Sequence, residues 1–431
     1  IRTIKEMGKK SVAVYSAGDK NASYLKHADE AVCIGGAKSS ESYLNIPALI
    51  TAAEMTGCDA IFPGYGFLSE NQDFVEICKL HNIKFIGPSS EVMEKMADKS
   101  KAKEEMVKAG VPVVPGSKGA VRTLDEGKKI AREIGYPIMA KASAGGGGRG
   151  MRLIKEEKDF DSQYLAASSE ALAAFGDGTM YLERFINNPR HIEVQVIGDS
   201  HGNAIHIGER DCSLQRRHQK VIEESPAILL NDETRAKLHE VAVKATKYLK
   251  YEGAGTFEFL ADDKQNIYFM EMNTRLQVEH PVSEMVSGLD IIEWMIKVAE
   301  GEKLPPQESI RFRGHAIECR ITAEDPNNFL PCPGKITQWM VPGGRNVRVD
   351  SHIYTNYIVP PYYDSMIGKL IVWGRDREKA INIMKRALSE FEVEGIKTNI
   401  PFHKKMMENK DFISNNYDTK YLENYKGLDS I

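Results

Sequence analysis

The most constraining feature of the chain is an acidic β-hairpin at residues 256–273. Its first part alternates polar and apolar residues, its middle is rich in turn formers, and its last part reads as a return strand. A turn centred just after Lys264 places Glu258 directly opposite Glu271, on a face shared with Asn273. Because like charges in opposed positions are destabilising, the hairpin predicts a cation between the two carboxylates.

The neighbours of these carboxylates indicate that the hairpin is buried. Phe257, Phe259, Met270 and Met272 alternate with the polar positions, so we expect largely buried strands. A hard divalent ion takes oxygen ligands, and Mg²⁺ is commonly held by one or two carboxylates together with substrate phosphates. The alternative interpretation is an exposed acidic strand face.

Length and composition limit the class of protein. With 431 residues, the chain predicts two or three domains, and 42% hydrophobic with 27% charged residues is typical of a globular protein. A net charge of −4 argues against a general nucleic-acid binder. No run of 18 apolar residues and no signal peptide is found. Six cysteines without a Cys-x-x-Cys pair fit a reduced cytoplasm, so we expect a cytoplasmic protein without a membrane or nucleic-acid partner.

Three regions follow one another along the chain. Up to about residue 96, short apolar runs alternate with helical stretches, which predicts a parallel, helix-covered sheet. Strands are expected at 11–16, 31–35, 59–63 and 84–87, and helices at 42–56, 71–81 and 91–109. The middle region should contain strands at 137–141, 151–154, 191–197 and 204–207 and helices at 160–175 and 233–248. After a proline-containing linker, the last region includes 314–322, 362–373 and a helix at 377–391.

A glycine run at residues 144–150 satisfies Gly-x-Gly-x-x-Gly. A dinucleotide fingerprint needs a helix that opens inside the motif, but residues 151–154 continue as a strand. A glycine loop between two antiparallel strands can instead fold over a nucleotide triphosphate, with Lys141 as a nearby point charge. A flexible linker is the alternative.

A Gly-x-Ser-x-Gly motif at residues 198–202 matches a nucleophile elbow in letters only. An elbow joins a strand to a helix, whereas this motif joins two alternating strands and predicts a hairpin turn. We therefore expect no catalytic role for Ser200.

Charged residues gather in two further segments. Arg210, Arg216, Arg217, His218 and Lys220 form a basic cluster, for which a solvated face is favoured over an anion site when the cluster is taken alone.

In the second segment, Glu279 could serve as a general base if burial raises its pKa, or it could pair with Arg275 in a structural ion pair. Charge spacing does not decide between these two. A lone histidine such as His191 is more often structural than a ligand.

Together these motifs resemble the ATP-grasp superfamily and, over essentially the whole chain, the biotin carboxylase family. The superfamily signatures are matched at 136–150 and 269–276, and those of biotin carboxylase at 64–71, 209–220, 277–280 and 360–366. The resemblance implies an α/β and α+β fold. It comprises a Rossmann-like N-terminal domain at 1–97 that lacks its first strand, an ATP-grasp domain at 98–300 with a glycine-rich lid at about 115–190, and a mixed α/β C-terminal domain at 301–431.

The resemblance also implies roles for particular residues. ATP should be held by Lys99, Lys141, Gly147, Gly148, Glu183, Arg184, Phe185, Ile186, His191, His218 and Leu260. Two Mg²⁺ or Mn²⁺ ions should be held by Glu258, Glu271 and Asn273. The bicarbonate site corresponds to Lys220, Arg275, Gln277, Val278 and Glu279, and Arg320 matches the arginine that faces the ureido oxygen of biotin.

The reaction implied is the ATP-dependent carboxylation of biotin by bicarbonate. Glu279 would deprotonate bicarbonate, which attacks the γ-phosphate to give carboxyphosphate. This intermediate breaks to CO₂ and phosphate, the phosphate takes a proton from the ureido nitrogen, and Arg320 stabilises the resulting oxyanion.

The implied partners are a biotin carboxyl carrier protein and a carboxyltransferase, with a homodimer formed through the helix that contains Arg2 and Glu6. The resemblance is greatest to the subunit of bacterial acetyl-CoA carboxylase. A pyruvate or propionyl-CoA carboxylase subunit, a carbamoyl-phosphate synthetase and a non-catalytic ATP-binding regulatory module are the alternatives.

Overall fold

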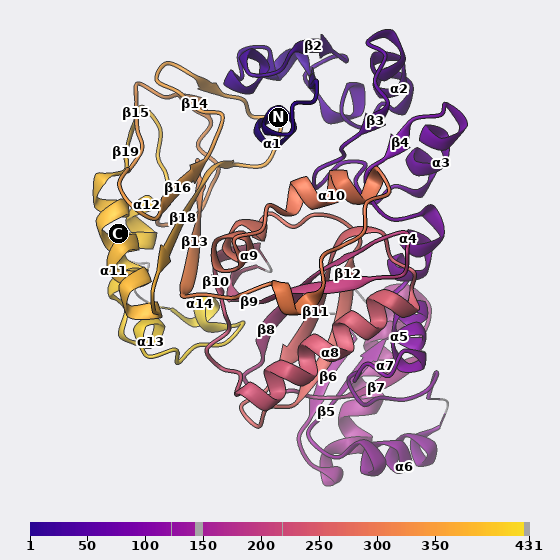
Figure 1. Ribbon diagram of the computed structural model, residues 1–431. Coiled ribbons are helices and arrows are strands. Elements are labelled where there is room, and N and C mark those ends of the chain that lie inside the picture. The colour runs from indigo at the N-terminus through magenta and orange to yellow at the C-terminus, as the bar shows by residue number, and fades with distance from the viewer. Residues whose placement is uncertain (122, 143–149, 218, 426–431) are drawn as a thin grey trace.

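A long antiparallel sheet joins the middle of the chain to its C-terminal part in the computed structural model, which describes residues 1–121, 123–142, 150–217 and 219–425. Its strand order is β12-β11-β8-β9-β10-β13-β18-β16, and Figure 1 shows it running through the molecule. The strands are β8 (Arg190–Gly198), β9 (Ala204–Arg216), β10 (Gln219–Ser225), β11 (Gly253–Ala261), β12 (Ile267–Asn273), β13 (His315–Thr322), β16 (Val347–Asp350) and β18 (Met366–Gly374).

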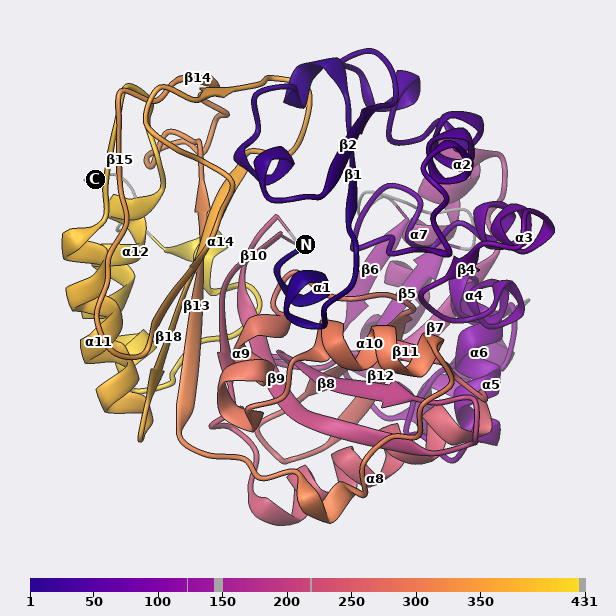
Figure 2. The same ribbon diagram turned by 45° about the horizontal axis from the view of Figure 1, so that its top comes forward.

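The N-terminal region has the parallel pairing that the alternation of strands and helices predicts. Strands β1 (Val12–Tyr15) and β2 (Glu30–Cys33) pair in parallel, as do β3 (Ala60–Ile61) and β4 (Lys84–Phe85). Within the described residues these form two separate two-stranded sheets, because β3 and β4 are only two residues long. The helices are α1 (Arg2–Glu6), α2 (Ile46–Met55), α3 (Gln72–Leu80) and α4 (Ser90–Ala97). Figure 2 shows α1 beside α10 (Ile291–Ala299).

The prediction of a single helix at 91–109 is wrong in one respect. Asp98 has an extended backbone (φ −87°, ψ 118°) and separates α4 from α5 (Lys99–Lys108). Its side chain accepts a hydrogen bond from the Lys101 amide at 2.8 Å, which satisfies one of the free N–H groups at a helix start. A capping aspartate inside an otherwise helical pattern therefore ends one helix and begins the next.

A smaller sheet in the middle region contains the glycine run. Its order is β6-β5-β7, formed by Met151–Ile154, Ile138–Ala142 and Met180–Arg184. Helices α6 (Leu124–Ile134) and α7 (Phe160–Phe175) pack beside it. Strands β5 and β6 are antiparallel, which confirms a strand after the glycines and excludes the dinucleotide fingerprint, while residues 143–149 lie outside the described part.

The Gly-x-Ser-x-Gly motif is a hairpin turn, as predicted. Gly198 at the end of β8 faces Ala204 at the start of β9, and Asp199 accepts hydrogen bonds from the amides of His201 and Asn203, both at 2.9 Å. No helix follows Ser200. The motif therefore has the letters of a nucleophile elbow without its strand-to-helix geometry.

In the acidic hairpin Glu258 and Glu271 are paired as predicted, but a β-bulge rather than the predicted turn position produces this pairing. Glu258 lies opposite Glu271, but Phe259 lies opposite Phe269 because the strands shift register between them, with Met270 as the extra residue. The turn is thus one position shorter than expected, and a β-bulge restores the pairing of the two glutamates. The bulge also turns Met270 outward to 38% exposure, contrary to the expectation that all four flanking apolar residues are buried.

The large sheet is continuous across residue 301, since β10 pairs with β13. Glu224 on β10 connects the two parts of the sheet. It accepts a hydrogen bond from Arg377 Nε at 2.7 Å and from the Tyr417 hydroxyl at 2.5 Å, and it contacts His315 Nε2 at 2.6 Å. Burial alone would raise the pKa of Glu224, but these partners outweigh it and the pKa is lowered. The carboxylate is therefore ionised and paired inside the protein.

Replacing Glu224 by alanine should lower the free energy of unfolding by about 3–5 kcal/mol, because Arg377 is left without its buried partner. Urea denaturation of the purified chain measures this. Glu378→Ala, an exposed position on α11 (Arg377–Glu390), is the control and should change stability by less than about 0.5 kcal/mol. Equal effects at the two positions would contradict a stabilising role for the buried contacts of Glu224.

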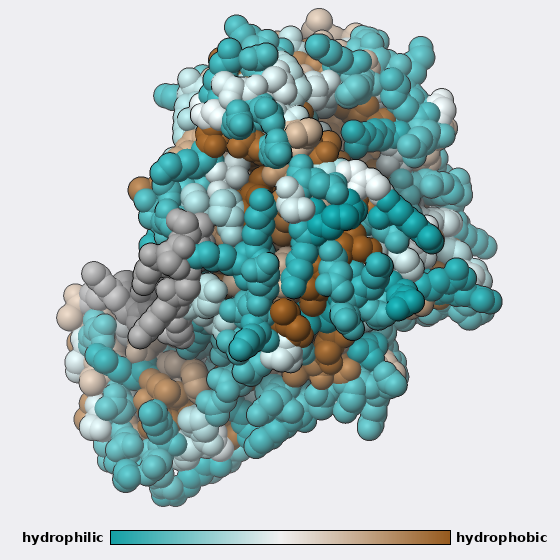
Figure 3. Space-filling model, turned by 90° about the vertical axis from the view of Figure 1, so that its left-hand side faces the viewer, coloured by the Kyte–Doolittle hydropathy of each residue, from teal (hydrophilic) through white to brown (hydrophobic). Residues whose placement is uncertain are grey.

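The C-terminal region packs its helices on one side of this sheet. Helices α11, α12 (Ile400–Glu408), α13 (Lys410–Ile413) and α14 (Tyr421–Asn424) cover a core that includes Ile317, Leu370 and Met384. Small pairs β14–β17 (Gly334–Lys335, Ile358–Val359) and β15–β19 (Gln338–Met340, Glu392–Glu394) complete the region. Figure 3, which views this side, shows a mostly hydrophilic surface with smaller hydrophobic areas between the polar side chains. Among the described helices, none combines the length and hydropathy needed to span a bilayer.

Candidate active site

A cleft of about 1560 Å³ lies where the N-terminal region faces the large sheet. It is lined from the sheet, from the segment after β12 and from the loops at residues 64–67 and 360–366. Ten of the residues expected in the site line it: Lys220, His191, Glu258, Glu271, Asn273, Arg275, Gln277, Val278, Glu279 and Arg320. The structure thus brings together side chains that are as far as 129 positions apart, from His191 to Arg320 (320 − 191).

Lys220 is the centre of a buried cluster of charges. Its Nζ atom donates to Glu279 Oε1 at 2.7 Å, to Glu258 Oε1 at 3.0 Å and to Glu193. Burial would lower the pKa of Lys220, yet the three carboxylates raise it well above its usual value. The lysine is therefore charged, and it neutralises carboxylates contributed by three separate parts of the chain.

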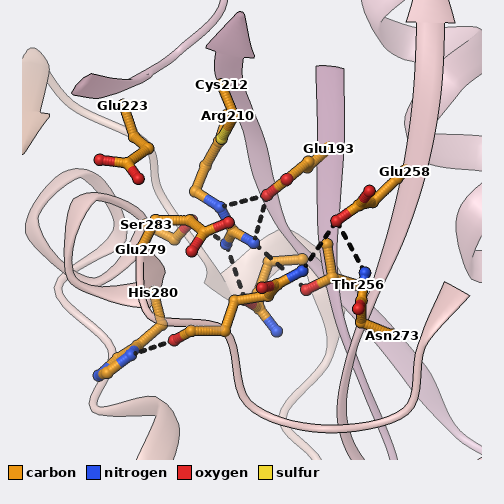
Figure 4. A network of polar contacts seen from close by, with 12 residues as sticks. Glu193, Arg210, Cys212, Glu223, Thr256, Glu258, Asn273, Glu279, His280 and Ser283 are labelled. Carbon is orange, nitrogen blue, oxygen red and sulfur yellow. Dashed lines mark hydrogen bonds and ion pairs between the residues drawn. The ribbon is translucent and has the colours of Figure 1, made fainter. Parts of the chain in front are cut away.

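A solvated face is the wrong interpretation for part of the basic cluster. Arg210 is fully buried and donates to Glu193 Oε2 from Nε and Nη2, to Gln195 Oε1 at 2.7 Å and to the Thr256 hydroxyl at 3.2 Å. Figure 4 shows Glu193 and Thr256 beside its guanidinium. The spacing of basic residues did not reveal this, because the carboxylate partner lies on the neighbouring strand β8.

The remaining basic residues lie toward the surface. Arg216 packs its guanidinium 4.0 Å from the centre of the Phe329 ring, and Arg217 is exposed. His218 lies outside the described residues. Only Arg210 and Lys220 of this cluster, among the described residues, take part in the buried charge network.

Glu258 is surrounded by nitrogen hydrogen-bond donors. Its Oε1 accepts from Asn273 Nδ2 at 2.7 Å and from Gln277 Nε2 at 3.0 Å as well as from Lys220. Burial would raise the pKa of Glu258, but Lys220 and His191 lower it. The Glu258 carboxylate and the Asn273 side-chain oxygen, which accepts from Arg275, are both oxygen donors of the kind that suits Mg²⁺.

The metal-ligand groups in the described residues differ from the predicted set. One combines Glu258 with His191 and Glu193, and another combines Glu193 with Cys212 and Glu279, with all ligand atoms of a group within 4.8 Å of one another. No described group of three includes Glu271, which nevertheless lines the same cleft. The facing of Glu258 and Glu271 is confirmed, whereas their joint metal binding stays a prediction.

His191 is more than a satisfied structural histidine. Its Nε2 lies 3.1 Å from oxygens of both Glu193 and Glu258, and Nδ1 lies 2.9 Å from the Gln215 amide nitrogen. Burial would lower the pKa of His191, but the two carboxylates raise it to about 9. The ring therefore lies between the two carboxylates and Gln215, in contact with Glu258.

Neither interpretation of Glu279 from sequence is correct as stated. Arg275 does not pair with it, since Arg275 donates to Glu70 Oε2 and to Asn273 Oδ1, both at 3.0 Å. Glu279 is fully buried, and its two oxygens accept from Lys220 at 2.7 Å and from Arg320 Nη2 at 2.9 Å. Burial by itself would raise the pKa of Glu279, but these cations lower it.

Those of the expected ATP contacts that the structure describes with their side chains fall into two groups. His191 lies in the cleft and Leu260 pairs with it across β11 and β8. Lys141 and residues 183–186 lie on or beside the smaller sheet, where Glu183 accepts hydrogen bonds from Lys141 and, at 2.7 Å, from Lys103. The rest of this group is Arg184, which donates to the Ile134 carbonyl, Phe185, whose amide donates to the Pro137 carbonyl, and buried Ile186.

Four expected ATP contacts are not tested. Gly147 and Gly148 lie outside the described residues, as does His218. Lys99 begins helix α5, but its side chain is outside the described part. Their roles stay predictions.

Several site residues escaped the sequence interpretation. Glu193 and Lys369 are buried and charged, and Lys369 donates to the Val278 carbonyl at 2.6 Å. Glu193 could have been found, because it alternates with His191 and Gln195 on one face of a strand that is otherwise apolar. Lys369 carried no comparable signal.

Aromatic side chains form the wall of the cleft on its N-terminal side. Phe67 stacks on Tyr43 with ring centres 5.0 Å apart, and Tyr363 meets Tyr43 at 5.6 Å. Phe67 is 55% exposed, which leaves an apolar surface on the same cleft as Arg320. The cleft therefore joins a charged floor to an apolar wall.

Three protein-family models match successive parts of the chain. The model described as biotin carboxylase, N-terminal domain, matches residues 1–93, and biotin carboxylase C-terminal domain matches 318–424. Carbamoyl-phosphate synthase L chain, ATP binding domain, matches 98–307. A biotin carboxylase from a Nostoc species is 55% identical over 425 residues, which cover 98% of this chain and 95% of the relative. The chain belongs to the biotin carboxylase family.

Solved structures agree with this assignment. A biotin carboxylase–βγ-ATP complex from Campylobacter jejuni is 68% identical, covers 98% of this chain and 95% of that chain, and superposes with a TM-score of 0.88. The biotin carboxylase domain dimer of Hydrogenobacter thermophilus 2-oxoglutarate carboxylase, in complex with MgADP, ADP and bicarbonate, is 49% identical with a TM-score of 0.86 and covers 100% and 95% of the two chains. The chain is an ATP-dependent carboxylase of the ligase class, and its reaction is the carboxylation of biotin.

Proposed function

We propose that this chain carboxylates biotin on a biotin carboxyl carrier protein, using bicarbonate and ATP, as the first half-reaction of acetyl-CoA carboxylase. The observation that supports this most strongly is the single cleft that contains Lys220, Glu258, Glu279 and Arg320 beside an aromatic wall. Cations and a carboxylate suit bicarbonate and phosphate, while the apolar wall suits the rings of biotin. A regulatory module that only bound ATP would need neither Glu279 nor Arg320.

The charge network suggests how bicarbonate is bound and deprotonated. Lys220 and Arg320 now hold both oxygens of Glu279, which keeps that carboxylate ionised and a poor base. An anion that enters between Lys220 and Arg275 competes with Glu279 for Lys220, and the pKa of Glu279 then rises as Lys220 turns toward the anion. Glu279 can take the bicarbonate proton at that point, and bicarbonate attacks the γ-phosphate to form carboxyphosphate.

Mg²⁺ fits the oxygen donors at one end of this cleft. Glu258 and Asn273 would hold it, with Glu271 on the facing strand, and the same residues would accept Mn²⁺. When bound, the ion neutralises charge on the nucleotide phosphates. Lys220 donates to the same carboxylate of Glu258, so we expect its side chain to shift when the ion binds.

Arg320 and the walls of the cleft serve the second half of the reaction. Carboxyphosphate breaks to CO₂ and phosphate, and the phosphate removes the ureido proton. Arg320 donates to the oxyanion that develops on the ureido oxygen. The fully buried side chains beneath it provide the rigid support that such positioning requires.

The glycine run should act as a lid over ATP. Replacing Gly147 and Gly148 by bulkier residues is expected to raise the KM for ATP, because closure depends on backbone freedom and close approach. Steady-state kinetics at saturating bicarbonate measure this. Unchanged kinetics would refute the lid role.

Release of ADP from ATP in the presence of Mg²⁺, bicarbonate and free biotin tests the proposed function. We expect biotin-dependent ADP release, and then faster turnover with the carrier protein of acetyl-CoA carboxylase than with that of a keto-acid carboxylase. ATP binding without turnover would support the regulatory module instead.

A second candidate shares the chemistry but not the acceptor. The similarity to the biotin carboxylase domain of a 2-oxoglutarate carboxylase favours a subunit that serves a keto acid, such as pyruvate. A faster reaction with a keto-acid carboxylase carrier would select it. We expect a cytoplasmic homodimer in either case, formed through α1.

A further inference from the structure

A pair of buried carboxyl groups lies beneath Arg320 and has no part in the scheme above. Glu223 on β10 and Glu318 on β13 are directly opposite each other in the sheet, and both are fully buried. Arg320 follows two positions after Glu318, on the same face of its strand. Two opposed carboxylates would repel each other strongly here, so the pair must share a proton or a cation.

The hydrogen bonds show which of the two holds Arg320. Glu223 Oε1 accepts from Arg320 Nε at 2.5 Å, while Glu279 Oε2 accepts from Arg320 Nη2 at 2.9 Å. The second oxygen of Glu223 and both oxygens of Glu318 have no hydrogen-bond partner among the described residues. Figure 4 shows Glu223, Glu279 and Arg210 around the same interior space.

Other charged and titratable groups surround the pair from each packed element. Burial is the main reason that the pKa of Glu223 is raised to about 7 and that of Glu318 is raised well above its usual value. Nearby groups act on one or both of them: Arg320 on β13, Lys220 on β10, Cys212 on β9, Lys369 on β18 and Glu279 before α9 (His280–Ser287). Glu318 therefore keeps its proton near neutral pH, while Glu223 changes charge within the working range of an enzyme.

The two bonds to Arg320 should have different fates during turnover. Once Glu279 takes the bicarbonate proton it is neutral, and its attraction to Arg320 weakens. Glu223 is the remaining carboxylate in contact with the guanidinium. The bond to Glu223 is therefore the one that can hold Arg320 through both halves of the reaction.

We propose that Glu223 is a positioning residue for the biotin half-reaction, because its carboxylate, bonded to Arg320 Nε, anchors Arg320 after Glu279 has been protonated. This inference rests on the proposed function of Arg320. Glu223 does not touch the substrates. It acts on the reaction through the orientation of the guanidinium.

Glu223→Gln and Glu318→Gln test the proposal, since both keep the size of the side chain. Two rates are measured for each protein: ADP release with bicarbonate alone, and the increase caused by free biotin. For Glu223→Gln we expect the biotin-dependent kcat to fall about 10- to 100-fold while the bicarbonate-only rate changes by less than about threefold.

The pH profile separates positioning from a structural role. With the bicarbonate concentration equal at every pH, the parent protein should lose biotin-dependent kcat as pH falls through about 7, where Glu223 becomes neutral. Glu223→Gln should lack this ionisation, whereas Glu318→Gln should retain it, because a neutral amide then replaces a neutral carboxyl opposite Glu223.

Failure of the positioning role can be told apart from failure of the proposed function. Parent-like kinetics for Glu223→Gln, loss of both rates together, or pH profiles that do not differ among the three proteins would overturn the positioning role. If the parent protein itself shows no biotin-dependent ADP release, the proposed function fails, and the role of Glu223 fails with it.

Discussion

Glu279→Gln is expected to bind ATP normally and to lose biotin-dependent turnover by about two to four orders of magnitude. The glutamine has nearly the same shape, but it cannot accept a proton from bicarbonate. It also withdraws the negative charge that Lys220 and Arg320 share. Equilibrium binding of ATP and the initial rate of ADP release measure the two halves of this expectation.

Glu209→Gln is the matched control for this variant. Glu209 is equally buried and paired, with Arg235 at 2.8 Å and His239 at 2.6 Å, but it does not line the cleft. We expect it to lower thermal stability while leaving kcat within about threefold of the parent. Near-normal activity of Glu279→Gln would remove Glu279 from the base role.

Arg320→Lys should reduce biotin-dependent turnover by about two to three orders of magnitude, the usual cost of losing an oxyanion donor. Lysine keeps the charge but has a single donor group, and it cannot bond Glu223 and Glu279 from separate nitrogens as the guanidinium does. ADP release with bicarbonate alone should persist, because carboxyphosphate forms before Arg320 acts on the ureido oxygen of biotin.

A second buried arginine provides the comparison. Arg377→Lys alters a guanidinium that pairs with Glu224 at 2.7 Å, away from the cleft. It should affect unfolding more than either rate. If Arg320→Lys lowers the bicarbonate-only rate as much as the biotin-dependent rate, Arg320 acts in bicarbonate chemistry or in folding rather than on biotin.

Local pattern was sufficient for most of the fold, because it depends on residues close in sequence. The alternation around Glu258 and the strand after the glycine run predicted both hairpins, and helix α7 has the predicted bounds, Phe160–Phe175. Pattern failed where one residue changes the course of the chain. The bulge at Met270 and the cap at Asp98 each required a local departure from regular geometry.

The site was less predictable, since its chemistry depends on partners that are distant in sequence. Motif resemblance correctly placed Lys220, Glu279 and Arg320 in one cleft. It could not show that Glu279 is held by two cations, because Lys220 is 59 positions away. Nor could it show the opposed pair of Glu223 and Glu318, which depends on the register of β10 with β13.

Transfer of labelled carbon from bicarbonate to biotin tests the central claim most directly. Incubation of the purified chain with ATP, Mg²⁺, labelled bicarbonate and biotin should give labelled carboxybiotin, with about one label for each ADP whose release depends on biotin. ADP release without label in biotin, or labelling that does not require ATP, would contradict the account.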